Sequence, residues 1–345
     1  MIYSIFPKHT ATVYSRYPTM NASEDEILEL NKTVSSSEVV GTYNTRILLD
    51  FDLYNNSASM AAEGITPASY SLSLYVANSN TPNPEFKIQL SDVGNAWGHG
   101  YGRSTHIPKT EVGVSWDIPF PNNTWTGDNG PSNITSIFPQ TNYSSLDKDL
   151  DMIDVTELAQ HVGSSIGNDK GMLLRRPNVQ EVDSKKYGYV NFYSAKTSTI
   201  YKPRLFVSHE DSSFVTGSLT ALDLTEEHYI YQATNPGTYK INSTPKFRFI
   251  GREKYPTATY TASTAALVGY LPTSSYYSLV DVRTGETVVP FDTTYTKISC
   301  DATGNFANLK LSGIYPDRLY QFHIRVDHNG TSTYHILDDM FRVYE

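Results

Sequence analysis

Aromatic side chains give this chain its most concentrated set of residues that could bind a ligand. All three tryptophans fall in one loop-rich region, residues 91–147, close to a glycine-rich stretch. Exposed aromatic rings stack on the apolar faces of sugars, and nearby Arg and Asn side chains can hydrogen-bond the hydroxyls. The tryptophans could instead be core residues of the surrounding strands, but we expect Trp125 and Tyr101 to be exposed. The predicted ligand-binding residues are Trp97, Tyr101, Arg103 and Trp125.

A second candidate is a serine motif. Residues 163–167 read Gly-Ser-Ser-Ile-Gly, which has the Gly-x-Ser-x-Gly spacing of a nucleophile elbow. An elbow places its serine after a strand and before a helix, whereas here a predicted helix precedes the motif and turn-forming residues follow it. The order is reversed, so we predict no catalytic residue. A pair of glycosidase carboxylates is defined by its separation in space, which a sequence does not provide.

Alternating carboxylates at Asp147, Asp149 and Asp151 could hold a hard cation if they shared one face of a strand. An EF-hand calcium loop would have a glycine at its sixth position and a glutamate at its twelfth, where this chain has Met152 and Leu158. We favour a solvated acidic turn and predict no metal or other cofactor. Calcium at residues 147–151 remains an open alternative.

Histidine and glycine patterns lack the partners that metal or phosphate chemistry needs. His99 and His106 could approach one another, as could His323 and His328, but neither pair has clustered Cys or carboxylate neighbours. The stretch 98–103 has no strand and helix around it that would make a phosphate-binding turn. We expect it to be a flexible loop.

The elements that carry these residues are predicted to be strands, because apolar and polar residues alternate in most segments. One short helix is expected, capped by Asp154 or Thr156 and ended by Gly163. Asn329-Gly330 predicts a type I′ turn, since both central residues of that turn need positive φ. The predicted strands are 10–14, 26–30, 45–53, 69–76, 86–90, 171–174, 188–193, 204–208, 246–250, 278–282, 286–289 and 320–326.

Composition agrees with an all-β protein of two domains. The 345 residues include 26 Tyr and 14 Phe but only 18% charged residues, which is typical of strands joined by polar turns. The net charge of −9 argues against a nucleic-acid partner. No segment has the roughly 18 apolar residues that membrane insertion needs. A single cysteine, Cys300, and the absence of a signal-peptide pattern at residues 1–8 predict synthesis in a reducing cytoplasm.

Several motifs in the first part of the chain occur in a characteristic order. They are residues 46–52 (RILLDFD), 70–75 (YSLSLY), Trp97, 111–116 (EVGVSW), 154–156 (DVT) and 203–207 (PRLFV). This order resembles that of DNRLRE-type domains, which are jelly-roll β-sandwiches of surface-exposed, secreted and viral proteins. The resemblance covers about residues 10–208 and implies that Trp97 and Trp116 pack in the sandwich. Residues 128–150 match the pattern poorly.

We therefore predict a jelly-roll β-sandwich at residues 1–210, a linker or connecting segment at 211–242, and a smaller immunoglobulin-like β-sandwich at 243–345. The second sandwich is suggested by about 100 residues with closely spaced turns. It also loosely resembles immunoglobulin-like modules of tailed-bacteriophage structural proteins.

The favoured function is that of a non-enzymatic structural virion protein of a tailed bacteriophage, associated with the tail or baseplate. An extracellular-looking sandwich made in the cytoplasm fits a virion component. The expected partners are other virion structural proteins, in multiple copies, and host surface glycans. The alternative is a carbohydrate-binding module of a bacterial cell-surface or secreted protein, and a third candidate is a glycan-degrading enzyme.

Two segments have the composition of an interface: residues 91–147 and residues 212–242. Both carry Tyr, Phe or Trp rather than Lys and Glu. One hypothesis is that at least one segment becomes ordered only against a neighbouring subunit. The alternative is that both fold back on their own sandwiches. The predicted anchors are Phe120, Trp125, Phe138 and Tyr229.

Overall fold

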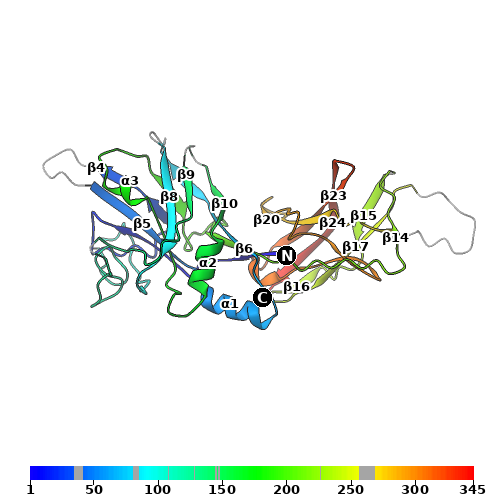
Figure 1. Ribbon diagram of the computed structural model, residues 1–345, viewed down its shortest axis with the longest axis horizontal. Coiled ribbons are helices and arrows are strands. Elements are labelled where there is room, and N and C mark those ends of the chain that lie inside the picture. Colours follow the sequence, from blue (N-terminus) through cyan, green and yellow to red (C-terminus); the bar gives the residue numbers. More distant parts are fainter. Residues whose placement is uncertain are drawn as a thin grey trace, which may run out of the picture. The chain divides into compact units, whose positions relative to one another are not determined.

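The computed structural model describes two compact units. The first unit is Ile5–Val207, and the second is Met1–Ser4 together with Ser208–Glu345 (Figure 1). Strands make up most of the regular structure of both units, which confirms the all-β prediction. The finer assignments, jelly-roll and immunoglobulin-like, stay predictions. The described residues are 1–34, 42–80, 85–107, 109–127, 129–143, 146, 148–225, 227–255 and 269–345.

The described strands between Ile2 and Ser208 form three sheets. One has the order β1 (Ile2–Ile5), β13 (Arg204–Ser208), β6 (Ser69–Leu74) and β10 (Leu150–Asp154). The largest has the order β2 (His9–Tyr14), β5 (Thr42–Asp50), β11 (Met172–Arg175), β8 (Phe86–Asp92) and β9 (Gln140–Tyr143), and β4 (Lys32–Val34) also pairs with β5. The third has the order β3 (Ile27–Leu30), β12 (Val190–Tyr193) and β7 (Val76–Ser79).

Strand β5 shows why the large sheet forms the core of this unit. It lies between β2 and β11, and Ile47, Leu48 and Leu49 are all fully buried. Consecutive apolar residues indicate a strand that is covered on both faces, whereas the alternation in β3 indicates one covered face.

The described residues of the first unit also form three helices: α1 (Leu53–Ala62), α2 (Thr156–Gly163) and α3 (Asn178–Val182). The predicted helix is confirmed as α2, which ends at Gly163. The predicted cap is wrong: Val155 occupies the N-cap position without a side-chain cap hydrogen bond, and Asp154, one residue earlier, accepts the Thr156 N–H at 2.9 Å. The prediction that a strand continues to Leu53 is wrong. Asp52 has φ 52° and turns the chain into α1.

The second unit has two sheets with an aromatic core. Phe247 of one sheet contacts Phe322 and Phe341 of the other, with ring centroids 4.8 Å apart in both contacts. The predicted type I′ turn is supported by φ values of 48° at Asn329 and 78° at Gly330. One sheet has the order β14 (Thr220–Ala221), β18 (Gly269–Tyr270), β17 (Lys246–Glu253), β22 (Gly304–Asn308) and β21 (Ser299–Asp301), with β15 (His228–Gln232) paired to β17. The other has the order β16 (Thr238–Lys240), β24 (Thr331–Tyr344), β23 (Leu319–His328), β19 (Ser275–Asp281) and β20 (Thr287–Val289).

The predicted linker at residues 211–242 is wrong, because this segment supplies three strands of the second unit. Strand β15 pairs with β17 along its whole length, and β16 pairs in parallel with the end of β24. The predicted boundary of the first domain also changes, since residues 1–4 belong to the second unit. The amine of Met1 donates to Asp211 at 3.0 Å and to the carbonyl of His209.

Candidate functional site

Between β8 and β9, the described residues 93–107, 109–127 and 129–139 form no helix or strand. We call these residues the loop platform. Val93, Val114, Trp116 and Trp125 of the platform are buried in one cluster, and Trp97 packs against it. The rest of the cluster comes from the large sheet: Ala11, Val13, Leu48 and Leu173. The platform is therefore packed onto the sheet, as the fold-back alternative predicted.

The glycine-rich turn of the platform is built around Asn21. The Asn21 side chain is fully buried, and its amide nitrogen donates to the carbonyls of His99 at 2.9 Å and Val114 at 2.8 Å. Its amide oxygen accepts the Gly102 N–H at 2.7 Å. A Cβ on Gly100 would lie 2.7 Å from this oxygen, so only glycine fits there. The expectation of a flexible loop at residues 98–103 is therefore wrong.

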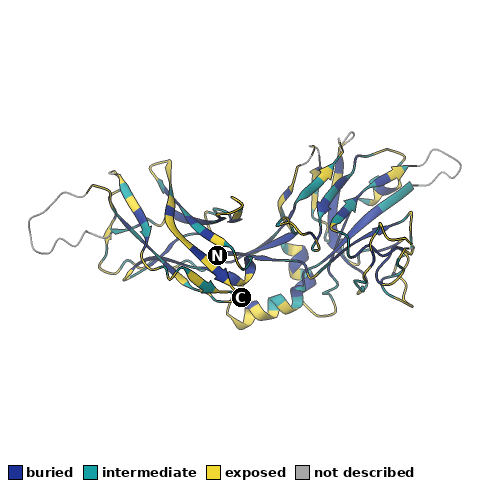
Figure 2. Ribbon diagram, turned by 180° about the vertical axis from the view of Figure 1, so that it is seen from behind, coloured by how far each residue is buried: buried dark blue, intermediate teal, exposed yellow. Residues whose placement is uncertain are grey.

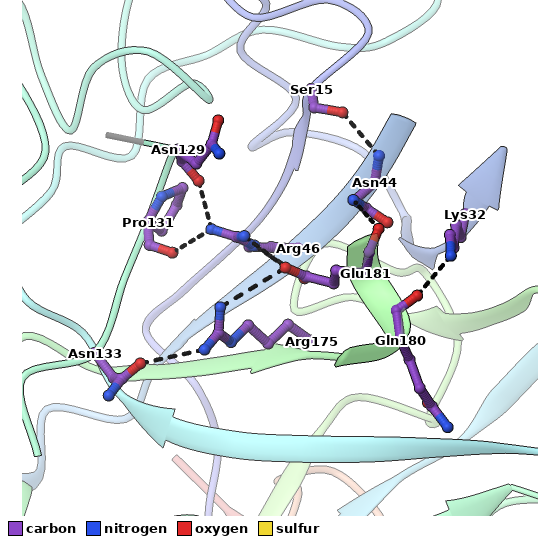
Figure 3. Close-up of polar contacts among 10 residues, drawn as sticks. All are labelled: Ser15, Lys32, Asn44, Arg46, Asn129, Pro131, Asn133, Arg175, Gln180 and Glu181. Carbon is purple, nitrogen blue, oxygen red and sulfur yellow. Dashed lines mark hydrogen bonds and ion pairs between the residues drawn. The ribbon is translucent and has the colours of Figure 1, made fainter. Parts of the chain in front are cut away.

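A buried ion pair ties the other end of the platform to the sheet (Figure 3). Arg46 of β5 contacts both carboxylate oxygens of Glu181 in α3, at 3.1 Å from Nε and 2.6 Å from Nη2. Its Nη1 donates to the backbone carbonyls of Asn129 and Pro131 at 2.6 and 2.7 Å. The guanidinium also lies 4.6 Å from the ring centroid of Trp116. One arginine thus links β5, α3 and the platform.

Arg175 of β11 extends this network. Its Nη1 lies 3.7 Å from the Glu181 carboxylate, and its Nη2 donates to the side chain of Asn133 at 3.3 Å. Burial lowers the pKa of Arg175; the nearby Arg46 lowers it as well, while Glu181 opposes both. Figure 3 shows Glu181 between the two guanidinium groups. The two guanidinium groups share one carboxylate, and their hydrogen bonds to Asn129, Pro131 and Asn133 attach the platform to β5 and β11.

Two surface cavities border this network, with volumes of about 470 and 500 Å³. They share Arg46, Asn129, Glu181 and Val182. The polar groups of Arg46 and Glu181 are already hydrogen-bonded within the protein. A molecule bound in these cavities would therefore be recognised by its shape and by hydrogen bonds to the backbone more than by an unpaired charge.

The predicted ligand-binding residues divide into two groups. The expectation that Trp125 is exposed is wrong: it is only 6% exposed, and its Nε1 donates to the carbonyl of Ser115 at 3.1 Å. Trp97 is half-buried and donates to the carbonyl of Lys170 at 2.9 Å. Tyr101 is 64% exposed, as predicted, and Arg103 is also exposed. The tryptophans hold the platform together, and Tyr101 and Arg103 remain on its surface.

The other sequence candidates have structural roles. Ser165 of the Gly-x-Ser-x-Gly motif follows α2 directly, so it has the reversed order predicted from the sequence. Asp149 accepts the backbone N–H of Val76 at 2.6 Å, and Asp151 accepts the hydroxyl of Ser73 at 2.8 Å. Asp147 lies outside the described residues. Within the part of the chain that the structure describes, no group of three His, Cys, Asp or Glu side chains could hold a metal ion.

The histidines pair differently from the sequence prediction. His99 does not form a pair with His106, which is exposed; it contacts His9 of β2 instead, with ring centroids 4.6 Å apart. His323 and His328 are five positions apart on β23, so their side chains leave opposite faces. Sequence spacing could not reveal the His9–His99 contact, because the two residues come from separate segments.

The surface of the platform exposes large apolar side chains. Buried and exposed stretches both occur along these loops, as the colouring in Figure 2 shows. Of the predicted anchors, Phe138 is 36% exposed, Phe120 is intermediate and Trp125 is buried, while Tyr229 of the second unit is 39% exposed. The most exposed apolar residues of the platform are Ile107 at 93%, Tyr101 at 64% and Ile134 at 64%.

Comparisons with known proteins add little to this description. No family model matches the chain, and no curated protein matches it. One solved structure that matches is a Parabacteroides merdae β-glucuronidase with glycerol in its active site. It has 11% identity and a TM-score of 0.15 over 79% of this chain and 27% of that chain, which is too low to carry an argument. In the described residues, no helix is long and apolar enough to cross a membrane.

Proposed function

We propose that this chain is a non-enzymatic structural protein of a tailed-bacteriophage virion, associated with the tail or baseplate. The loop platform is then its contact surface for neighbouring virion proteins. The proposal rests on one observation. Hydrogen bonds from Asn21 and Arg46 and a buried tryptophan cluster attach the long platform to the rest of the unit, yet the platform exposes large apolar side chains.

The rigidity of the platform supports a binding role. A free loop loses conformational entropy when it binds, and a loop already held in place avoids most of that loss. Exposed apolar side chains such as Ile107 and Ile134 are typical of surfaces that become covered in an assembly. Multiple copies in a particle would provide that cover.

Incorporation into particles tests this proposal. Ile107→Asp and Ile134→Asp place a charge on the platform without touching its buried anchors. We expect each variant to enter purified particles at a level at least about tenfold lower than the wild-type chain, measured by quantitative mass spectrometry. The matched control is Ile166→Asp, because Ile166 is 76% exposed on the same unit but outside the platform.

The proposal is wrong if the wild-type chain is absent from particles, or if all three folded variants are incorporated equally. Circular dichroism shows whether each variant is folded. A chain found on a bacterial surface instead would support the alternative location.

A carbohydrate-binding module is the second candidate. The observation that favours it is Tyr101, whose exposed ring lies on a turn held by Asn21, with exposed Arg103 two residues away. A glycan array with wild-type protein and Tyr101→Ala tests this. Tyr255→Ala is the control, since Tyr255 is 76% exposed in the second unit. If the wild-type protein binds no glycan, or if Tyr101→Ala binds equally well, Tyr101 is not a sugar-binding residue.

A further inference from the structure

Two histidines meet where the loop platform contacts the large sheet. The rings of His9 in β2 and His99 in the platform have centroids 4.6 Å apart and planes inclined at 34°. Among the described residues, neither Nδ1 of His9 nor Nε2 of His99 has a hydrogen-bond partner, and both atoms are buried. Two neutral imidazoles can stack in this way, whereas two imidazolium ions would repel one another.

The charges around this pair act in both directions. Glu24 lies 3.6 Å from Nδ1 of His99 and also pairs with Lys196 at 2.7 Å. The pKa of His99 is lowered by burial first, then by His9 and Lys196; Glu24 and a backbone hydrogen bond with Gly100 oppose this.

His9 has a similar environment on the strand side. Its pKa is also lowered, mainly by burial. Asp50, which lies opposite His9 in the β2–β5 register, and Glu24 favour the charged form, while Lys8 and Lys196 disfavour it. Both histidines are therefore neutral at pH 7, and both resist protonation as long as the rings remain in contact.

His99 lies at a point where its displacement would affect the whole turn. Its carbonyl accepts from Asn21, and the adjacent Gly98 accepts the Val114 N–H at 2.7 Å and donates to the carbonyl of Pro119 at 2.9 Å. These bonds join the backbone of residues 98–99 to Asn21 and to Val114 and Pro119 of the platform. A movement of His99 away from β2 that carries its backbone along would strain all of them.

We propose that His9 and His99 form an acid-sensitive latch, which holds the glycine-rich turn on β2 at neutral pH and releases it when both rings become protonated. The released form binds up to two more protons than the latched form. The ratio of released to latched protein therefore increases as the pH falls below the ordinary histidine pKa. For each proton, the increase is up to about tenfold per unit of pH. This inference concerns the motion of the platform and does not depend on the identity of its partner.

The three tryptophans make the latch measurable. Because all of them belong to the platform, tryptophan fluorescence reports on this region and not on the second unit. We would follow quenching by acrylamide, a neutral quencher, from about pH 7.5 to pH 4.5 in the full-length protein. We expect quenching to rise cooperatively with acid while the far-ultraviolet circular dichroism of the strands stays constant.

Substitutions of the two histidines test whether they cause the acid-induced rise in quenching. Gln cannot take up a proton, so His9→Gln and His99→Gln should each reduce the pH dependence, and the double variant should remove it. His106→Gln is the matched control, because His106 is exposed in the same loop region. The proposal is wrong if wild-type quenching does not change with pH, or if the double variant keeps the transition.

A second measurement uses the wild-type protein and therefore tests the proposal even if the variants do not fold. The titration of each histidine in the wild-type protein can be followed by nuclear magnetic resonance of its ring protons. We expect His9 and His99 to titrate together, below the ordinary pKa and in parallel with quenching. Titration of both at the ordinary pKa, with no change in quenching, would overturn the latch.

Discussion

Replacing Glu181 by glutamine removes the anion that lies between two buried guanidinium groups. The side chains of Arg46 and Glu181 are only 7% and 4% exposed, and that of Arg175 is 6% exposed. Glutamine keeps the volume of glutamate, so the loss is electrostatic rather than a loss of packing. Breaking a buried pair by removing one partner costs about 3–5 kcal/mol. We expect Glu181→Gln to lower the free energy of unfolding of the first unit by a similar amount at neutral pH.

Urea unfolding followed by tryptophan fluorescence measures this change, because every tryptophan lies in the first unit. For a unit of this size, the expected loss corresponds to a urea midpoint lower by about 1–2 M. Glu111→Gln is the control: Glu111 is exposed in the same unit, and its carboxylate lies 3.5 Å from the hydroxyl of Thr19, so its loss of charge should leave the urea midpoint nearly unchanged. If Glu181→Gln shifts the midpoint by less than about 0.3 M, the network does not hold the platform as described.

Three further changes test other parts of the structure. Gly100→Ala should lower stability by at least about 1–3 kcal/mol and open the platform to limited proteolysis, because Gly100 has φ 76° and no space for a Cβ; a protease-resistant variant would contradict this. Trp125→Phe should lower the free energy of unfolding by about 1–3 kcal/mol through loss of a buried hydrogen bond, whereas Tyr101→Ala should not; equal effects would place Trp125 on the surface. Burial, and then His228, lower the pKa of His335 to about 4. The unfolded chain takes up this proton first, so the contribution to stability is present above the ordinary pKa of 6.5 and is lost as the pH falls toward 4. Thermal unfolding of the second unit should therefore be less acid-sensitive in His335→Gln, and an unchanged pH profile would refute this.

Local patterns in the sequence were sufficient to predict much of the fold. Helix α2 was predicted from Asp154, Thr156 and Gly163; its bounds agree, although Val155 rather than Asp154 or Thr156 occupies the N-cap position. The turn at Asn329-Gly330 followed from the backbone conformations that these two residues allow. Most strands were predicted from alternation, which depends only on residues two positions apart. These features are determined by interactions within a few residues of the chain.

The candidate site depends instead on contacts between distant segments. Glycines at 100, 102 and 113 were visible in the sequence, but nothing local identified Asn21 as the side chain against which they pack. Strands β14 and β16 were missed because they are short and their partners β18 and β24 lie far along the chain.

Trp125 shows the limit of what the sequence determines. As a large aromatic residue in a loop, it could either pack in the core or bind a ligand at the surface, and the sequence left both outcomes open. Only the tertiary structure decided between them, by laying the platform on β2, β5 and β11. Arg46 and Glu181 are likewise 135 positions apart, so their pairing exists only after the sheet has brought β5 and α3 together. Burial and charge pairing are properties of the assembled surface, which the neighbours of a residue in the sequence do not determine.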